Sequence, residues 1–489
     1  MSDNCTNSGS TCAPVDGLAT ADQVDLSFRW AGLPLIWAAG AWLLVASLLL
    51  LVGAIKVLAP NFIAGCSFLS YGRVEAAIVP AVVLGFGVQS GLLLAAWLNG
   101  RLGKSPLVGC AGVHVFTLAW NFSLALGVVG ILEGDGDGSG FLALPTYATW
   151  PMAAIYLIGA ALVLLNLKLR QVRELYPSQW FLFLAVVWFG WAFSGGVLSK
   201  ALLRPGALHY IVDLWFRQQA VWLGLIPVTL AVATYLIPKL GEVSLQPRAL
   251  ALFLFWSWTF ILPWGGIPQA APLPAWLVGL GVVTSWLALV PGAALFSLVR
   301  ATIPNGCSAV RRHSEGWLVM ASMVSTLGAL VLGWLSTFDK IAALTDSTSF
   351  GRGVWLLAIL GSGGLGILAG ILHAIPRITG VDWVKPELVR LHVFSALGGV
   401  ALMVVGQLGG GLLAGLKSAS IGTPMLQAMS AARPAYALSV LGGLALAGSA
   451  LLLILLVALQ TWRAFSNCCA PMVCSWLQPV TGKKGAANS

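Results

Sequence analysis

Five histidines are the residues best able to bind a metal or to move protons, and the chain spaces them widely. His209 and His313 fall between long apolar segments, whereas His114, His373 and His392 fall near the ends of such segments. A haem or copper site between helices needs converging imidazoles, as an H-x-H pair would supply, and no such pair occurs. A lone histidine at such an end more often serves structure than ligation. The histidines by themselves therefore predict no metal centre.

Carboxylates inside the apolar segments are equally sparse. Glu75, Asp213 and Asp339 lie at segment ends, and the middle thirds contain no Asp or Glu. A proton-coupled pump or a cation transporter normally has a carboxylate near the membrane midplane, so this pattern disfavours both. Arg217 follows Asp213 by four residues, which predicts an ion pair on one helix face.

The composition identifies the elements that carry these residues. The 489-residue chain is 58% hydrophobic and 9% charged, with a mean hydropathy of +0.91. Soluble proteins have roughly 25% charged residues, so a soluble enzyme and a disordered chain are excluded. The net charge of +10 comes from basic residues dispersed through short loops, which predicts no nucleic-acid partner. We predict an all-α membrane protein.

One crossing of a bilayer takes about 20 mostly apolar residues. The chain has twelve such spans, at 33–59, 75–98, 107–132, 149–169, 179–200, 214–237, 249–267, 274–299, 316–338, 353–375, 390–415 and 436–461. No linker divides them, which predicts a single twelve-helix transmembrane domain at 33–462. It is preceded by a polar N-terminal tail, 1–32, and followed by a C-terminal tail, 463–489.

The distribution of basic residues predicts the orientation. Lys and Arg are more frequent at the N-terminus and in loops after even-numbered spans than in loops after odd-numbered spans, and the acidic loop Glu133-Gly-Asp-Gly-Asp137 follows an odd-numbered span. Because cytoplasmic loops carry the excess of Lys and Arg, both termini are expected in the cytoplasm.

Short motifs near the span ends resemble those of a known family. Tyr235-Leu-Ile-Pro-Lys239 and His373-Ala-Ile-Pro-Arg377 end two spans in the way that spans end in the catalytic subunit (subunit I) of haem-copper oxidases. The chain is most similar to the cbb-type (C-family) cytochrome c oxidase and nitric oxide reductase branch. Further matches in order and spacing are Ser70-Tyr-Gly-Arg73, Pro274 with Trp276, Ser336-Thr-Phe-Asp339, Leu391-His-Val-Phe394, Arg433-Pro-Ala-Tyr436 and Leu441-Gly-Gly443. The resemblance implies a subunit I-like bundle over nearly the whole chain.

In that family, six histidines on spans 2, 6, 7 and 10 bind two haems and a copper, and the resemblance carries their positions onto other residues here. These positions are Ile78, Gln218, the pair Gly266 and Ile267, and Val354 and Leu356 in Gly353-Val-Trp-Leu356. The family's tyrosine falls on Phe260. Apolar side chains do not ligate, and an amide is a poor ligand for copper or haem iron. We therefore assign no catalytic, cofactor-binding or metal-binding residue and expect neither haem nor copper in this chain.

These observations favour a degenerate, non-catalytic subunit that acts as a scaffold in a respiratory electron-transfer complex. As the resemblance implies, it would lie in a bacterial inner membrane as a multi-pass protein, in contact with lipid. It would dock other subunits of the complex, including membrane-anchored cytochrome c, and those subunits would carry the haem and copper.

Two alternatives stay open at this stage. A transporter or channel could use the vacated interior, and a continuous polar path past Gln218 and Gln219 would favour that hypothesis. A subunit with one haem b could instead hold it through His114 together with His373 or His392.

Overall fold

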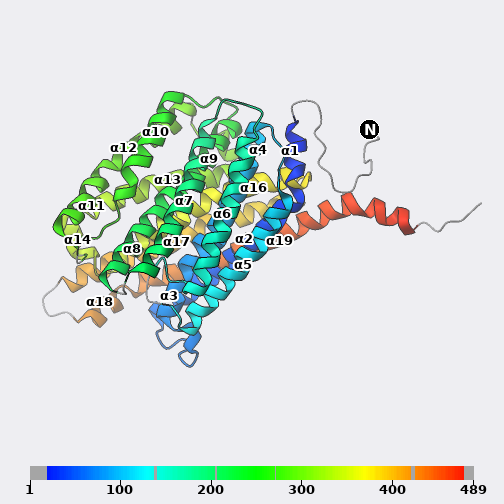
Figure 1. Ribbon diagram of the computed structural model, residues 1–489. Coiled ribbons are helices and arrows are strands. Elements are labelled where there is room, and N and C mark those ends of the chain that lie inside the picture. Colours follow the sequence, from blue (N-terminus) through cyan, green and yellow to red (C-terminus); the bar gives the residue numbers. More distant parts are fainter. Residues whose placement is uncertain are drawn as a thin grey trace, which may run out of the picture.

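A computed structural model of the chain describes residues 19–136, 140–203, 206–269, 271, 273–304, 306–419 and 424–477. In these ranges the regular elements are all helices, and eleven of them are long and apolar enough to cross a membrane. They lie side by side in one bundle (Figure 1). The prediction of an all-α, multi-span membrane protein is confirmed. Segments 1–18 and 478–489 of the predicted tails and Asp137 of the acidic loop lie outside the described residues.

Every predicted span coincides with a helix or with successive helical segments. The outer spans are α2 (Arg29–Leu58), α5 (Cys110–Glu133), α6 (Thr146–Lys168), α7 (Pro177–Leu202), α11 (Ala275–Leu287) with α12 (Leu289–Thr302), α13 (Ser314–Leu335), α17 (Pro386–Ser418) and α19 (Arg433–Leu477). Short helices between them are η1 (Ser67–Leu69), η5 (Val310–Arg312), α14 (Asp339–Thr345) and α18 (Met425–Ala431).

Three inner spans form the centre of the bundle, and each contains a π-helical segment between two α-helices. They are α3 (Tyr71–Val79), η2 (Pro80–Val88) and α4 (Gln89–Gly103); α8 (Ala207–Gln219), η3 (Ala220–Leu225) and α9 (Ile226–Leu240); and α15 (Phe350–Leu356), η6 (Leu357–Gly364) and α16 (Leu365–Thr379). Their most apolar stretches are 83–94% buried, whereas those of the outer spans are at most 61% buried. These three are the predicted spans 2, 6 and 10.

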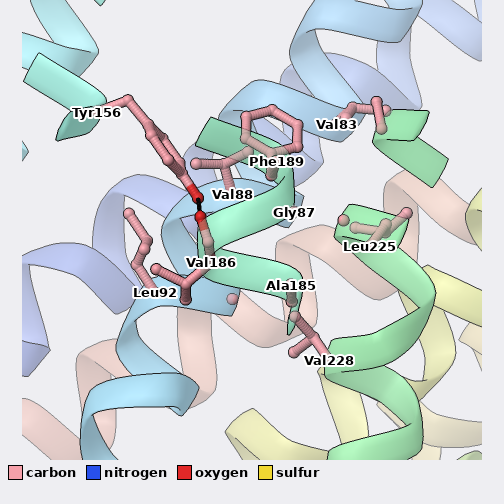
Figure 2. A pocket seen from close by; sticks show the side chains of 13 residues that line it. Val83, Gly87, Val88, Leu92, Tyr156, Ala185, Val186, Phe189, Leu225 and Val228 are labelled. Atoms are coloured by element: carbon pink, nitrogen blue, oxygen red, sulfur yellow. Dashed lines mark hydrogen bonds between the residues drawn. The ribbon is translucent and has the colours of Figure 1, made fainter. Parts of the chain in front are cut away.

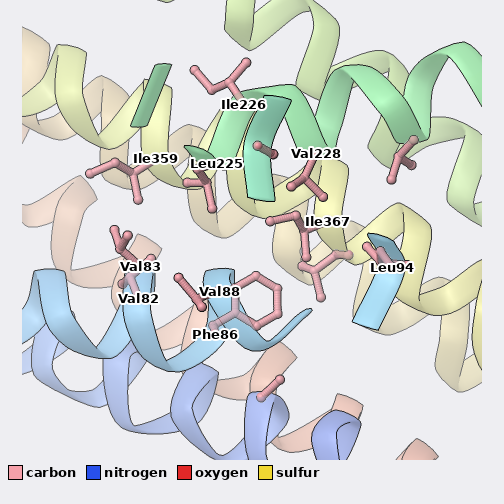
Figure 3. Packing of buried hydrophobic residues seen from close by; sticks show 14 of the residues in the cluster. Val82, Val83, Phe86, Val88, Leu94, Leu225, Ile226, Val228, Ile359 and Ile367 are labelled. Atoms are coloured by element: carbon pink, nitrogen blue, oxygen red, sulfur yellow. The ribbon is translucent and has the colours of Figure 1, made fainter. Parts of the chain in front are cut away.

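The π-helical segments η2, η3 and η6 contact one another where the inner spans meet. Glycines allow this approach, because a Cβ at Gly87 or Gly363 would overlap the side chain of Leu225. Thr229 then donates its hydroxyl to the carbonyl oxygens of Ser362 and Gly363 at 3.1 and 3.2 Å. A π-helical turn disturbs the regular backbone ladder, and this hydroxyl gives two carbonyls of η6 an additional donor, the Ser362 carbonyl also accepting from the Leu365 N–H. Valine, leucine and isoleucine side chains from the three spans fill the remaining space (Figure 3).

The predicted span 249–267 is a shorter helix than expected. It consists of α10 (Arg248–Ile261) and the 3₁₀ turn η4 (Leu262–Trp264), and it lies outside the group of eleven long helices. Pro263 sits at the start of the turn, and residues 265–269 that follow have no helical structure. Proline and paired glycines end a helix readily, so residues 265–269 can follow a non-helical path beside the interior of the bundle.

The polar N-terminal segment also contains structure. Helix α1 (Ala21–Ser27) begins with a capping box formed by Thr20 and Gln23, and it packs against α4 and α16. Its Asp25 is buried, accepts a hydrogen bond from Trp97 Nε1 at 2.9 Å and pairs with Arg101. At the other end of the chain, α19 continues through Leu477, beyond the predicted end of the last span, and leaves the bundle (Figure 1).

The packing of the inner spans predicts that one added methyl group will have a large effect on the stability of the protein. An added Cβ at Gly366 would overlap the side chain of Thr229. We expect Gly366→Ala to lower the free energy of unfolding by about 1–3 kcal/mol, because overpacking forces the neighbours apart. The thermal unfolding midpoint of the purified protein in detergent measures this. Gly448→Ala is the matched control, since nothing lies within 4 Å of its added Cβ. Equal midpoints for the two variants would contradict the proposed packing.

Candidate functional site

A cavity of about 500 Å³ lies beside the first halves of the three inner spans. We call it the inner-span cavity. Its walls come from α3 and η2, from the junction of α8 and η3, and from α15 and η6, together with α11, α13 and the non-helical segment 265–269. The early end of α10 and η4 is what allows this last segment to form one wall.

All six positions that the family resemblance assigns to metal ligands line this one cavity. They come from four different spans and are Ile78, Gln218, Gly266, Ile267, Val354 and Leu356. Because residues so distant in the sequence meet at one place, the residue-by-residue correspondence is supported by the fold itself. Phe260 is different: its ring is 67% exposed and stacks on Trp256, so the structure does not bring it to the cavity.

The side chains at these positions do not fit a haem iron or a copper ion. Ile78, Val354 and Leu356 offer only hydrocarbon, and Gly266 has no side chain. Gln218 is 4% exposed and donates its amide Nε2 to the carbonyl oxygen of Leu262 at 2.6 Å. Within the described ranges, no group of three or more His, Cys, Asp or Glu could hold a metal ion.

Charged side chains line the cavity near the starts of α3 and α15. Glu75 and Arg352 form an ion pair with an oxygen–nitrogen distance of 2.7 Å, and Arg352 also donates to the Tyr71 hydroxyl at 3.3 Å. No sequence pattern joins Glu75 to Arg352, since the two residues lie on different spans. The one available signal was that Arg352 directly precedes the Gly353-Val-Trp-Leu356 motif.

The predicted ion pair of Asp213 and Arg217 is wrong. Asp213 accepts hydrogen bonds from the backbone N–H groups of Phe141 and Leu142 at 2.8 and 2.9 Å. Arg217 donates to the carbonyl oxygen of Gly266 at 2.9 Å, and its guanidinium lies 4.5 Å from the centre of the Trp355 ring. A spacing of four residues made the pair feasible, but tertiary partners on other segments take both groups.

The two glutamines of α8 do not open a polar path through the described part of the bundle. Gln219 donates to the carbonyl oxygen of Pro263 and accepts from Trp188 Nε1, each at 2.9 Å, so both ends of its amide are occupied. Deeper in the interior, the space between η2, α6, α7 and η3 contains a void of only about 30 Å³, with an apolar lining (Figure 2). Its one polar group, the Tyr156 hydroxyl, donates to the carbonyl oxygen of Val186 at 2.9 Å.

The three span-end histidines lie on three helices with separate surroundings. His373 on α16 has its Nδ1 3.1 Å from Glu315 and packs edge-on against Trp97 and Tyr235. His392 on α17 is fully buried, with its Nδ1 2.8 Å from the Ser449 carbonyl oxygen.

The third of these histidines, His114, is half-buried on α5, which packs against α2, α3, α6 and η2. The four cavities found in the described regions are lined by other residues than these three histidines.

Comparison with known proteins identifies a family. The family described as cytochrome c and quinol oxidase polypeptide I matches residues 30–445. A cytochrome c oxidase subunit 1 homolog of Azorhizobium caulinodans is 22% identical over 475 residues, covering 91% of this chain and 82% of its own length. The cbb3-type cytochrome c oxidase subunit CcoN1 of Stutzerimonas stutzeri is 22% identical over 433 residues, covering 81% and 86% respectively.

A solved structure of a haem-copper terminal oxidase dimer has the same fold. It superposes with a TM-score of 0.67 at 12% sequence identity and covers 91% of this chain and 84% of the solved chain. The predicted resemblance and the predicted subunit I-like fold are confirmed.

The ion pair at the cavity can be tested with a double-mutant cycle. Glu75→Gln, Arg352→Gln and the double variant should give a coupling free energy of about 1–2 kcal/mol, since both groups are partly withdrawn from solvent. Unfolding in dodecyl sulfate measures it. Glu174 with Arg248 is the matched control pair, because both side chains are exposed, and its coupling should stay below about 1 kcal/mol. Equal couplings for the two pairs would contradict the partly buried position of Glu75 and Arg352.

Proposed function

Because the chain belongs to the cytochrome c and quinol oxidase polypeptide I family, we propose that it is a degenerate subunit I that acts without catalysis of its own. It serves as an integral scaffold subunit of a respiratory electron-transfer complex in a bacterial inner membrane. The observation that carries this proposal is the convergence of six ligand positions on the inner-span cavity, with no imidazole among them.

The packing of the interior supports the same function. A subunit that had lost its cofactors and nothing else would retain a large void, and residual cavities destabilise a protein by about 24 cal/mol per Å³. In this chain apolar side chains fill the centre, where η2, η3 and η6 meet, and the inner-span cavity of about 500 Å³ is left beside it. The packed centre therefore holds the three inner spans together without a porphyrin.

The relatives support membership of an oxidase-like complex. One has the name of a cytochrome c oxidase subunit 1 homolog and another that of a cbb3-type oxidase subunit. We propose that this chain keeps the subunit I surface for its partners, among them a membrane-anchored cytochrome c, and that the haem and copper of the complex reside in those partners. Lipid covers the rest of its outer face.

A cofactor analysis tests the proposal. The chain is purified away from its partners, and haem is measured as the pyridine haemochrome and copper by elemental analysis. We expect less than about 0.1 haem b and 0.1 copper per chain, because the cavity offers no ligand that fits either. A haem-copper terminal oxidase prepared in the same way is the positive control.

Two results would contradict the non-catalytic proposal. One haem b per chain, or oxygen reduction by the separated chain, would overturn the non-catalytic proposal. His114→Ala, His373→Ala and His392→Ala would then show which imidazole holds the haem. Purification of the tagged chain with its partners completes the test: a c-type cytochrome at fixed stoichiometry is expected, and its absence would overturn the docking proposal.

A further inference from the structure

The lining of the inner-span cavity changes character along its length. Near the starts of α3 and α15 and at the end of α14 its lining is polar and charged, with Glu75, Arg352, Thr345 and Asp346. Along η2 and η6 it is apolar, with Val82 and Ile359. The volume of about 500 Å³ lies within the roughly 300–1,000 Å³ typical of small-molecule sites. This shape suits a ligand with one polar end and one hydrocarbon end.

Several polar atoms of the lining are buried without a hydrogen-bond partner. Three are donors, the Nε atoms of Arg217 and Arg352 and the Nε1 of Trp334. Two are acceptors: Oε1 of Gln218, on a side chain that is 4% exposed, and Oε2 of Glu75, which makes no hydrogen bond although it lies 2.7 Å from Arg352 in the ion pair. Leaving such a group unsatisfied costs about 1–3 kcal/mol, and buried polar groups in native proteins are therefore usually paired. Five such atoms around one cavity, three of them donors, indicate an occupant that accepts hydrogen bonds.

Arg217 supplies the charge that selects this occupant. A guanidinium has five N–H donors, and here its hydrogen bond goes to a backbone carbonyl oxygen, that of Gly266. The carboxylate nearest along the helix, Asp213, is engaged by backbone N–H groups, and among the described residues Arg217 forms no ion pair. Arg352, in contrast, is neutralised by Glu75. An anionic group beside Arg217 would complete the site.

We propose that the inner-span cavity binds a single-chain amphipathic carboxylate, a fatty acid, with its carboxylate at Arg217 and its chain along η2 and η6. The proposal rests on the proposed function, because a cavity that held haem would have no room for this ligand. A single chain fits better than a two-chain phospholipid, since the apolar part of the cavity lies among the most buried spans of the bundle.

Equilibrium binding of radiolabelled dodecanoate to the purified full-length chain tests the proposal. We expect one saturable site per chain, displaced by unlabelled dodecanoate and not by dodecanol, which lacks the carboxylate. Arg217→Gln should weaken binding about ten- to hundredfold, as expected for loss of a charge-assisted hydrogen bond. Arg300→Gln is the matched control, because Arg300 lines a separate groove between α12 and α13 and should leave the affinity unchanged.

A second pair of variants tests the location without touching charge. Gly333 lines the cavity, and nothing lies within 4 Å of a Cβ added there, so Gly333→Leu should fold and reduce binding by occupying space. Gly398→Leu on α17 has equally open surroundings outside the cavity and should bind normally. Elution of both variants as monodisperse protein establishes that they are folded.

The outcomes separate the two proposals. Haem in the same preparation would overturn the proposed function and this inference together. A haem-free chain that binds no dodecanoate, binds dodecanol equally well, or binds equally with Arg217→Gln and Gly333→Leu would overturn the inference alone. Saturable binding of radiolabelled phosphatidylglycerol to a haem-free chain that binds no dodecanoate would assign the site to a phospholipid and would likewise overturn it.

Discussion

The close approach of the three inner spans is the constraint on which the rest of this bundle depends. In hydrocarbon every backbone polar group needs an internal partner, so spans that depart from the regular α-helix must replace the hydrogen bonds that they lose. Here η2, η3 and η6 meet at Gly87 and Gly363, which admit the side chain of Leu225, and Thr229 donates its hydroxyl to two carbonyl oxygens of η6. The outer helices pack around this centre, and α19 lies along α17 and α2.

The same arrangement produces both the filled centre and the cavity beside it. Near η2, η3 and η6 the spans are close enough for apolar side chains to interdigitate. Beside the first halves of the three inner spans the packing leaves the inner-span cavity, and the early end of α10 and η4 adds the non-helical segment 265–269 to its wall. Charged groups survive there because they are paired, as Glu75 with Arg352, or hydrogen-bonded, as Arg217.

The chain has the subunit I fold of its family, and the positions onto which the resemblance carries the family's ligands hold apolar residues, a glycine and a glutamine. Isoleucine, valine and leucine at these positions can be buried in a membrane interior without electrostatic cost. Histidines without a bound metal would be buried polar groups that need hydrogen-bond partners. Gln218 is intermediate, since its amide nitrogen is hydrogen-bonded to Leu262 and its oxygen is not. Under the proposed scaffold function, the inner-span cavity is open to a new occupant, which its arginines would select.

The sequence by itself determined the membrane class, the placement of twelve apolar segments, the family and the positions onto which the resemblance carries the family's ligands, because hydropathy and short motifs are local properties. The tertiary structure decided where those positions lie relative to one another. It brought Ile78, Gln218, Gly266 and Leu356 to one cavity, placed Phe260 on the outer face, and exchanged the expected partner of Arg217 for Gly266 and Trp355. Contacts between spans depend on how helices rotate and approach one another, and the apolar pattern of a buried helix, being nearly uniform around its circumference, leaves that rotation unspecified.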